Sequence, residues 1–255
     1  MKIVVAVKQV PERDAVVRVD ASGRGLDEGD VAWTMNEPDA YALEEALQLK
    51  ERTGDGEVVV VSVGPERVVS TLREALAKGA DRAVHVVVES LVERDTLDVA
   101  RLLVSAIEGE KADLVLTGLQ SDDLGAGQTG VVMAELMGVP HATLVLGVDV
   151  VDRGIKVKRE LEDGWFQQVE MGLPALLTVQ SGGNKLRYAT LMGIKRARTK
   201  ETKEVEGAAA GARVDEVVRV VVPLRVKSIE MLTGSVDEIA AGVVERLKRQ
   251  GVVGK

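Results

Sequence analysis

Apolar runs of strand length alternate with amphipathic segments of helix length through the first part of the chain. The apolar runs have few polar interruptions, which is typical of strands buried on both faces of a parallel sheet. Between them, apolar residues recur at the three- and four-residue spacing of one helix face. This alternation predicts an α/β fold with a doubly wound, mostly parallel sheet and helices on both faces. The expected strands are 3–7, 16–19, 57–63, 82–88 and 113–117, and the expected helices open at 36–39, 66, 96 and about 131.

The pattern changes after residue 140. Three segments, 143–150, 155–161 and 166–171, are joined by turn-rich residues, which predicts antiparallel strands inserted as a hairpin. The apolar run 174–179 predicts a strand that returns to the main sheet.

Residues 181–212 contain no long apolar run, and they include a basic patch at 185–203. A polar segment of this length inside a compact chain is either a functional arm or a disordered linker. An expected strand at 217–222 and an amphipathic helix at 236–249 follow, which suggests an extended arm whose end packs on another molecule. The predicted domains are therefore a main α/β domain at 1–181, a loop and extended arm at 182–212, and a strand–helix segment at 213–255.

The segment 118–130 joins a buried strand to a helix and is rich in glycine. Its glycines allow close approach of a ligand, and Gln128 and Thr129 add hydrogen-bonding side chains. The start of the helix offers free N–H groups and a positive dipole end, which favour an anion such as phosphate. The spacing GxGxxG is present but too far from the strand for a dinucleotide fingerprint, and the lysine of a GxxxxGK[ST] loop is missing. An ordinary strand–helix turn is the competing interpretation.

In a doubly wound sheet, ligands bind beyond the carboxyl ends of the strands. Three of the expected strands end at 6–8, 62–64 and 117–120, and the first long helix begins at 36–39 with Asn36 as a plausible cap. We expect these segments to converge with Gly125–Gly130 on one site.

Composition excludes several classes of function. The net charge of −8 argues against nucleic acid as a partner, because neutralising phosphates requires a basic face. The apolar runs are shorter than a membrane span, and the first apolar run is too short for a signal peptide. Cysteine is absent, which excludes disulfides, thiolate metal sites and cysteine nucleophiles. We expect a soluble, cytoplasmic protein with no membrane insertion.

The sequence offers little catalytic chemistry of its own. His85 sits in a valine-rich strand and is expected to be a satisfied core residue, and His141 could lie near the site but has no evident partner. We find no nucleophile–base arrangement and no metal motif such as HExxH. Any redox role must therefore come from a bound cofactor, and the chain is expected not to be an enzyme by itself.

Several acidic residues are ambiguous. Asp122 and Asp123 could bind a metal, but paired acids in a loop usually stay solvated. Glu44 and Glu45 are expected on the outer face of their helix, away from the core.

One long block identifies a family. The residues from Val157 to Thr178 contain a basic residue, an acidic turn, then glutamine, an apolar residue and a proline before an apolar strand. This block resembles the β subunit of electron transfer flavoprotein. The blocks Val5–Lys8, Asp113–Gly118 with Gln128–Gly130, and Arg187–Leu191 agree with it in order and spacing.

The resemblance implies a heterodimer with an electron transfer flavoprotein α subunit that holds one FAD, mostly in the α subunit. Such a carrier takes electrons from flavin dehydrogenases and passes them to a quinone oxidoreductase. The family's main domain is similar to adenine-nucleotide α-hydrolase folds and holds a structural AMP. Carried over to this sequence, the AMP contacts would be Ala6, Asn36, Glu37, Pro38, Asp39, Val63, Gly125, Ala126, Gly127, Gln128, Thr129, Gly130, Val131, Val132, Met133 and Ala134.

The resemblance also implies a loop at 182–196 that docks on the dehydrogenase, with Leu191 as its apolar anchor. A leucine surrounded by charged residues suits an anchor with a charged rim. The competing interpretation is a leucine at a helix start that packs on its own chain. The other expected docking residues are Arg187, Tyr188, Lys195 and Arg196.

Two alternatives stay open. Electron-bifurcating members of the family hold a second FAD in place of AMP, and glycine at 125 and 127 would leave room for it. A stand-alone ATP-binding regulatory module of the same fold is the other alternative, although it would not need the long polar arm. For a eukaryotic source the mitochondrial matrix would replace the cytoplasm, although no transit peptide is seen.

Overall fold

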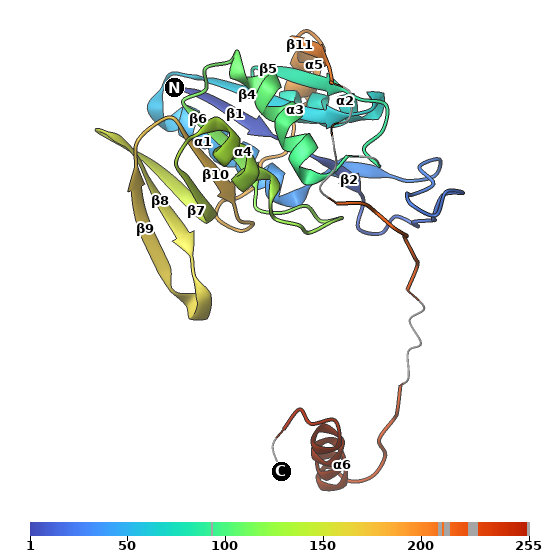
Figure 1. Cartoon of the computed structure of the whole chain (residues 1–255). Helices are drawn as coiled ribbons and strands as arrows, with labels where there is room; N and C mark the ends of the chain where they lie inside the picture. The colour runs from blue at the N-terminus through green and yellow to red at the C-terminus, as the bar shows by residue number, and fades with distance from the viewer. Residues whose placement is uncertain (93, 209–210, 212–214, 224–228, 254–255) are drawn as a thin grey trace. The chain divides into compact units, whose positions relative to one another are not determined.

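The computed structural model describes the chain except residues 93, 209–210, 212–214, 224–228 and 254–255 (Figure 1). Two compact units are present, Met1–Val220 and Val221–Lys255. Parts of the predicted arm and of the predicted strand–helix segment thus lie outside the described residues. The domain boundaries at 181 and 212 stay a prediction, and residues on both sides of them belong to the first unit.

Nine strands form one sheet within the described residues, in the order β11-β5-β4-β1-β6-β10-β7-β8-β9. The strands from β11 to β7 pair in parallel, whereas β8 and β9 pair antiparallel as a hairpin extension of β7. A separate antiparallel pair joins β2 to β3. The bounds are β1 Lys2–Ala6, β2 Gln9–Pro11, β3 Trp33–Met35, β4 Glu57–Gly64, β5 Arg82–Val87, β6 Leu114–Gly118, β7 His141–Val151, β8 Gly154–Glu160, β9 Phe166–Met171, β10 Ala175–Val179 and β11 Thr202–Glu206.

Helices cover both faces of this sheet (Figure 1). Side chains of α1 and α2 form one buried cluster on one face, and those of α3 and α4 form a second cluster on the other. The predicted doubly wound α/β fold with an antiparallel insertion is confirmed. The bounds are α1 Glu37–Thr53, η1 Glu66–Val68, α2 Val69–Lys78, α3 Thr96–Glu108, α4 Thr129–Met137, η2 Glu162–Gly164, α5 Leu191–Ala197 and α6 Val236–Arg249.

Strand β1 is the point at which the winding reverses. The chain runs outward from β1 through β4 to β5, then crosses to β6 on the other side of β1. The connections leaving β1 and β6 therefore diverge and open a crevice at the carboxyl ends of these strands, where α/β proteins bind ligands.

Two predicted strands are wrong. Residues 16–19 form no strand, and only an isolated bridge joins Val19 to Leu26. Residues 217–222 also lack strand structure, and Val218 is exposed. Residues 16–19 make only that single bridge, and among the described residues no strand pairs with 217–222, so neither segment gains the ladder hydrogen bonds that strand structure requires.

The segment after 181 is more ordered than its polarity suggested. Strand β11 pairs in parallel with β5 and extends the sheet, and α5 packs on α2 with Ala197 buried. Strand β11 lies at the edge of the sheet and is largely exposed to solvent. Its mostly charged side chains are tolerated for this reason.

The prediction that Glu44 and Glu45 lie on the outer face of their helix is also wrong. Both side chains are buried, because residues that follow β10 cross over α1 and cover this part of it. Arg187 bonds Glu44, and Asn184 bonds Glu45. Helical spacing locates the face toward the sheet but cannot show that a later segment covers a second face.

The unit Val221–Lys255 contains the predicted amphipathic helix, which is confirmed as α6. Ser235 accepts a hydrogen bond from the N–H of Glu238, and the Glu238 side chain accepts one from the N–H of Ser235. This reciprocal capping box fixes the start of the helix through local residues alone. Across the described chain, each helix falls short of the length and apolar character needed to cross a bilayer.

Candidate functional site

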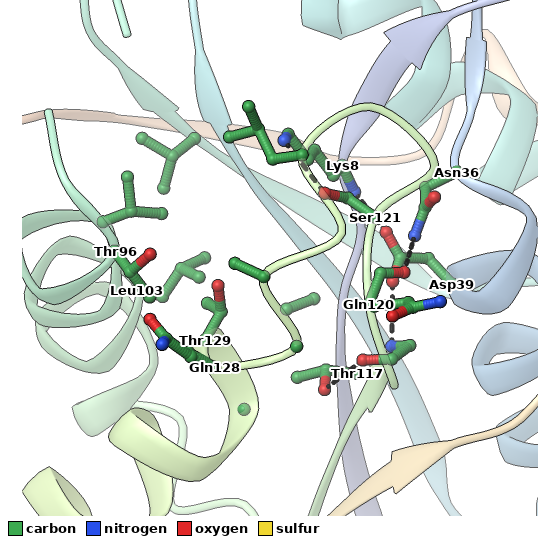
Figure 2. Close-up of a pocket in the computed structure, with 18 of the residues that line it drawn as sticks. Lys8, Asn36, Asp39, Thr96, Leu103, Thr117, Gln120, Ser121, Gln128 and Thr129 are labelled. Atoms are coloured by element: carbon green, nitrogen blue, oxygen red, sulfur yellow. Dashed lines mark hydrogen bonds between the residues drawn. The ribbon is translucent and has the colours of Figure 1, made fainter. Parts of the chain in front are cut away.

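A cavity of about 170 Å³ lies at the carboxyl ends of β1, β4 and β6, at the point where the winding reverses (Figure 2). The predicted convergence of the strand ends, the start of α1 and the glycine-rich segment is confirmed. The lining residues are Ala6, Val7, Lys8, Asn36, Asp39, Val63, Leu91, Arg94, Asp95, Thr96, Val99, Leu103, Thr117, Gly118, Leu119, Gln120, Ser121, Leu124, Ala126, Gly127, Gln128, Thr129 and Gly130.

Asp39 ties two of these strand ends together. Its carboxylate accepts hydrogen bonds from the N–H of Lys8 at 2.7 Å and from the N–H of Gly118 at 2.8 Å. Only 6% of the residue is exposed. Burial raises the pKa of the Asp39 carboxyl to about 7, although both N–H donors favour its ionised form. Asp39 therefore positions the cavity wall from the first turn of α1.

Asn36 occupies the predicted cap position of α1 but does not cap the helix with its side chain. Its Nδ2 donates to the carbonyl oxygen of Gln120, and its Oδ1 accepts from the N–H of Asp122, each at 2.9 Å. The side chain thus satisfies two backbone groups of the loop after β6 instead of the helix end. Figure 2 shows Asn36 beside Gln120 and Asp39 on this side of the cavity.

Lys8, two residues after the end of β1, fixes the same loop. Its Nζ donates to Asp123 at 2.7 Å and to Ser121 Oγ at 3.3 Å. Burial raises the pKa of the Asp123 carboxyl, but the charge and hydrogen bond of Lys8, together with hydrogen bonds from Ser121 and the N–H of Leu124, outweigh burial and lower that pKa. Asp122 accepts a hydrogen bond from the N–H of Glu37. Both acids thus have partners within the protein, and neither belongs to a metal-compatible cluster of the described residues.

The start of α4 faces the cavity. Gln128 stands at the cap position but makes no side-chain capping bond, so the first N–H groups of the helix lack this partner. By contrast, Asp95 caps α3 at the same cavity by accepting from the N–H of Asp98. The uncapped end of α4, with its positive dipole end, is therefore the better place for an anion.

Glycine is required in this segment for two different reasons. Gly125 and Gly127 adopt φ values of +64° and +63°, which side chains other than glycine seldom adopt. Gly130 lies against the sheet, where an added Cβ would come within 2.5 Å of Thr178 Cγ2 and 2.6 Å of Thr117 Oγ1. The backbone conformation therefore explains why glycine occupies positions 125 and 127. A larger ligand is not needed to account for Gly125 and Gly127.

The structure gathers only some of the residues that the resemblance assigned to AMP. Ala6, Asn36, Asp39, Val63 and 126–130 line the cavity. The others are adjacent in sequence but lie outside the lining, and a contact of any of them with AMP stays a prediction. Those outside are Glu37, Pro38, Gly125, Val131, Val132, Met133 and Ala134.

Sequence reasoning missed the wall formed by the connection from β5 to α3. Leu91, Val99 and Leu103 make this wall apolar, and Arg94 adds a cation that is paired with Asp98 at 2.6 Å. This wall could have been predicted from the carboxyl end of β5, which lies at the same edge of the sheet as the ends of β1, β4 and β6. His141 does not line the cavity, because it begins β7.

A second candidate surface is the recognition segment, residues 182–196. Tyr188 is 91% exposed and Leu191 is 87% exposed. The interpretation of Leu191 as a leucine packed on its own chain is therefore wrong, although it does begin α5. Lys195 and Arg196 are also exposed on this helix.

Arg187 holds the recognition segment on α1. Its guanidinium donates to both carboxylate oxygens of Glu44, at 2.8 and 3.0 Å, and to both of Glu51, at 2.7 and 3.1 Å. Burial works to raise the pKa of Glu44, but the hydrogen bonds from Arg187 and Gln48 outweigh it and lower that pKa. Arg187 was predicted to dock a partner, and the structure shows it engaged with its own chain.

Comparison with known proteins agrees with this architecture. The family model for the electron transfer flavoprotein domain matches residues 24–210. Electron transfer flavoprotein subunit beta of Methylophilus methylotrophus is 40% identical, over 96% of this chain and 97% of the relative. The mitochondrial subunit beta of Oryza sativa subsp. japonica is 39% identical over 99% and 100%, and the Homo sapiens subunit beta is 36% identical over 87% of each chain. With identity of this level along nearly its whole length, the chain belongs to the family of electron transfer flavoprotein β subunits.

Proposed function

We propose that the chain works as the β subunit of an electron-carrying heterodimer and holds a structural AMP in the cavity between α3, α4 and the ends of β1, β4 and β6. The α subunit shares one FAD with it. Electrons enter this FAD from flavin dehydrogenases and leave towards a quinone oxidoreductase. The redox chemistry belongs to the FAD, and the chain supplies binding and docking surfaces.

The observation that carries the AMP assignment is the uncapped start of α4 beside an apolar wall. The N–H groups at Thr129 and Gly130 suit the phosphate of a mononucleotide. Val63, Val99 and Leu103 offer an apolar surface for the base. An arrangement with one anion site and one apolar wall fits a mononucleotide such as AMP.

A second FAD in this cavity, as in the bifurcating members of the family, is supported less well. That alternative depended on glycine at 125 and 127 as a source of space. Both glycines have left-handed backbone conformations that explain them without a larger ligand.

Two exposed surfaces support the proposed partners. Tyr188, Leu191 and Met192 gather apolar area at the recognition segment, which suits docking on a dehydrogenase. In the C-terminal unit, Met231 and Val236 are exposed, which suits packing on an α subunit.

Co-expression with an α subunit of the same source tests the heterodimer. We expect a complex with flavin absorbance in the visible spectrum and one FAD per complex. Purification of the chain as a flavin-free monomer from this co-expression would contradict the proposal and favour a stand-alone nucleotide-binding module.

The nucleotide is tested separately by denaturing the purified complex and separating the released compounds by chromatography. We expect AMP and FAD in equal amounts. Two FAD per complex without AMP would contradict the AMP assignment and leave the heterodimer intact. Thr129→Val, which keeps the backbone N–H but removes the hydroxyl, should retain AMP if the backbone binds the phosphate.

A further inference from the structure

Three side chains come together from the segment after β4 and from the neighbouring strands β5 and β11. Glu66 begins η1 just after β4, His85 lies on β5, and Glu204 lies on β11. One donor atom from each residue can be chosen so that all three lie within 4.8 Å of one another. His85 and Glu204 are register partners on adjacent parallel strands, so their side chains leave the same face of the sheet. This cluster is separate from the cavity, whose lining includes none of the three residues.

His85 has one ring nitrogen without a partner. Its exposed fraction is 0%, and Nε2 lies 2.9 Å from the carbonyl oxygen of Gly64. A carbonyl oxygen only accepts, so Nε2 carries a hydrogen, and in the neutral imidazole Nδ1 then carries a lone pair. Nδ1 is buried and has no hydrogen-bond partner. The expectation that His85 is a core residue is confirmed, but its hydrogen bonding is only half satisfied.

This state of His85 is the one that a metal ion requires. Metal-binding histidines usually donate the hydrogen of the second nitrogen to a carbonyl or carboxylate, which fixes the ring and its tautomer. The carbonyl of Gly64 holds His85 in this way. Without a metal ion, a buried acceptor that lacks a partner destabilises the folded state.

The two carboxylates complete the donor set. Glu66 and Glu204 are both exposed, and their proximity brings like charges together beside the imidazole ring of His85. A dipositive ion turns this repulsion into attraction. One imidazole nitrogen with two carboxylate oxygens suits zinc and related ions, and solvent can fill a further position.

We propose that Glu66, His85 and Glu204 form a binding site for a divalent transition-metal ion of the zinc type, with Nδ1 of His85 as the nitrogen ligand. The ion links the connection after β4, strand β5 and the edge strand β11. It therefore stabilises the attachment of β11, the last strand among the described residues of the first unit. The proposal does not depend on AMP or on the α subunit.

The histidine content of the chain allows a direct test. The chain has two histidines and no cysteine, so ¹⁵N-labelled histidine gives ring signals from His85 and His141 alone. Titration of the full chain with Zn²⁺ should shift the Nδ1 signal of His85 at about one equivalent and leave the His141 signals in place. The variant His141→Asn assigns the signals. An unchanged His85 signal at one equivalent of Zn²⁺ would overturn the proposal.

Substitution of the exposed ligands tests the same site without disturbing the core. Zn²⁺ affinity measured by calorimetry should fall at least tenfold in Glu66→Gln and in Glu204→Gln. Glu206→Gln is the matched control, because Glu206 lies two residues further on the same face of β11 and outside the cluster. Zn²⁺ should raise the Tm of the native chain and of the control, but not that of the two ligand variants. Equal losses in Glu206→Gln and Glu204→Gln would mean adventitious binding to surface acids and contradict the proposal.

Discussion

Two of the buried carboxylates on helix α1, those of Asp39 and Glu44, serve different regions of the molecule. Asp39, in its first turn, accepts hydrogen bonds from two backbone N–H groups and forms the cavity wall. Glu44, five residues later, is paired with the guanidinium of Arg187 and holds the recognition segment. Burial dominates at Asp39 and raises its pKa to about 7, whereas hydrogen bonds from Arg187 lower the pKa of Glu44 against the effect of burial.

The difference shows that burial alone does not decide the charge state of an acid. Both residues are nearly inaccessible, with exposed fractions of 6% for Asp39 and 4% for Glu44. A fixed guanidinium favours ionisation more than two neutral N–H donors do. The recognition segment is therefore attached by an ion pair, whereas Asp39 frames the cavity through hydrogen bonds from two backbone N–H groups.

The largest effect on stability is expected from breaking the ion pair between Arg187 and Glu44. Arg187→Ala leaves the Glu44 carboxylate buried without its partner, which should lower the free energy of unfolding by about 4 kcal/mol. Urea denaturation at pH 7 measures it. Glu51→Ala is the control, because it removes the exposed partner of Arg187 and should cost about 1 kcal/mol or less. Equal losses in the two variants would mean that Glu44 does not depend on Arg187.

The next effect concerns how the free energy of unfolding depends on pH. Asp39 and Glu44 should contribute to this dependence with opposite signs. The folded pKa of Asp39, about 7, exceeds its ordinary value of 3.8, so the native state holds this proton more tightly than the unfolded chain does. Between pH 3.8 and 7 the unfolded chain ionises first, and stability falls as the pH rises, by at most about 1.4 kcal/mol per pH unit. Asp39→Asn should remove this slope.

Glu44 supplies the comparison for that experiment. Its folded pKa lies below the ordinary value of 4.5, so its contribution to stability is present above pH 4.5 and is lost as the pH falls through the folded pKa. The free energy of unfolding should therefore be measured from pH 4 to 8 for both proteins. As the pH rises, the stability of the Asp39→Asn variant should increase relative to that of the native chain. Parallel curves for the two proteins would show that Asp39 ionises at its ordinary pKa.

A smaller effect is expected at the start of α4, on the cavity side. Gly130→Ala places a methyl group against Thr117 and Thr178, so helix and strand must separate, at a cost of about 1–3 kcal/mol. Thermal unfolding measures the loss, and the nucleotide content of the purified complex should fall with it. Glu135→Ala, on an exposed position of the same helix, should leave both quantities unchanged. Full stability in Gly130→Ala would show that α4 is not held closely on the sheet.

The smallest effect on stability is expected at the tip of the recognition segment. Leu191→Ala should change the free energy of unfolding by less than about 0.5 kcal/mol, because the side chain is exposed. It should nevertheless slow electron transfer from a dehydrogenase, with unchanged FAD content. Stopped-flow reduction of the heterodimer measures this rate, with Val16→Ala as an exposed control outside the segment. Equal rates in the two variants would argue against Leu191 as the anchor.

The sequence by itself determined the elements whose cause is local. Exposing a continuous apolar run to water is unfavourable, so the bounds of β1, β4, β6 and β10 were predicted within a residue or two. The helix at 236–249 follows from its own cap and from the spacing of its apolar residues. The order of these elements was enough for the doubly wound fold, and that fold places strand ends together at one edge.

Tertiary structure alone decided which polar groups meet. Whether Glu44 is buried depends on Arg187, which lies 143 residues away in the chain, and the unpaired nitrogen of His85 became visible only when Gly64 and Glu204 were placed around it. Edge strand β11 was missed because its polar side chains are tolerated only where β5 offers it an open edge. Local sequence patterns indicate whether a residue is buried or requires a cap. The partner that pairs with a buried polar group comes from a distant part of the chain, and only the tertiary structure identifies it.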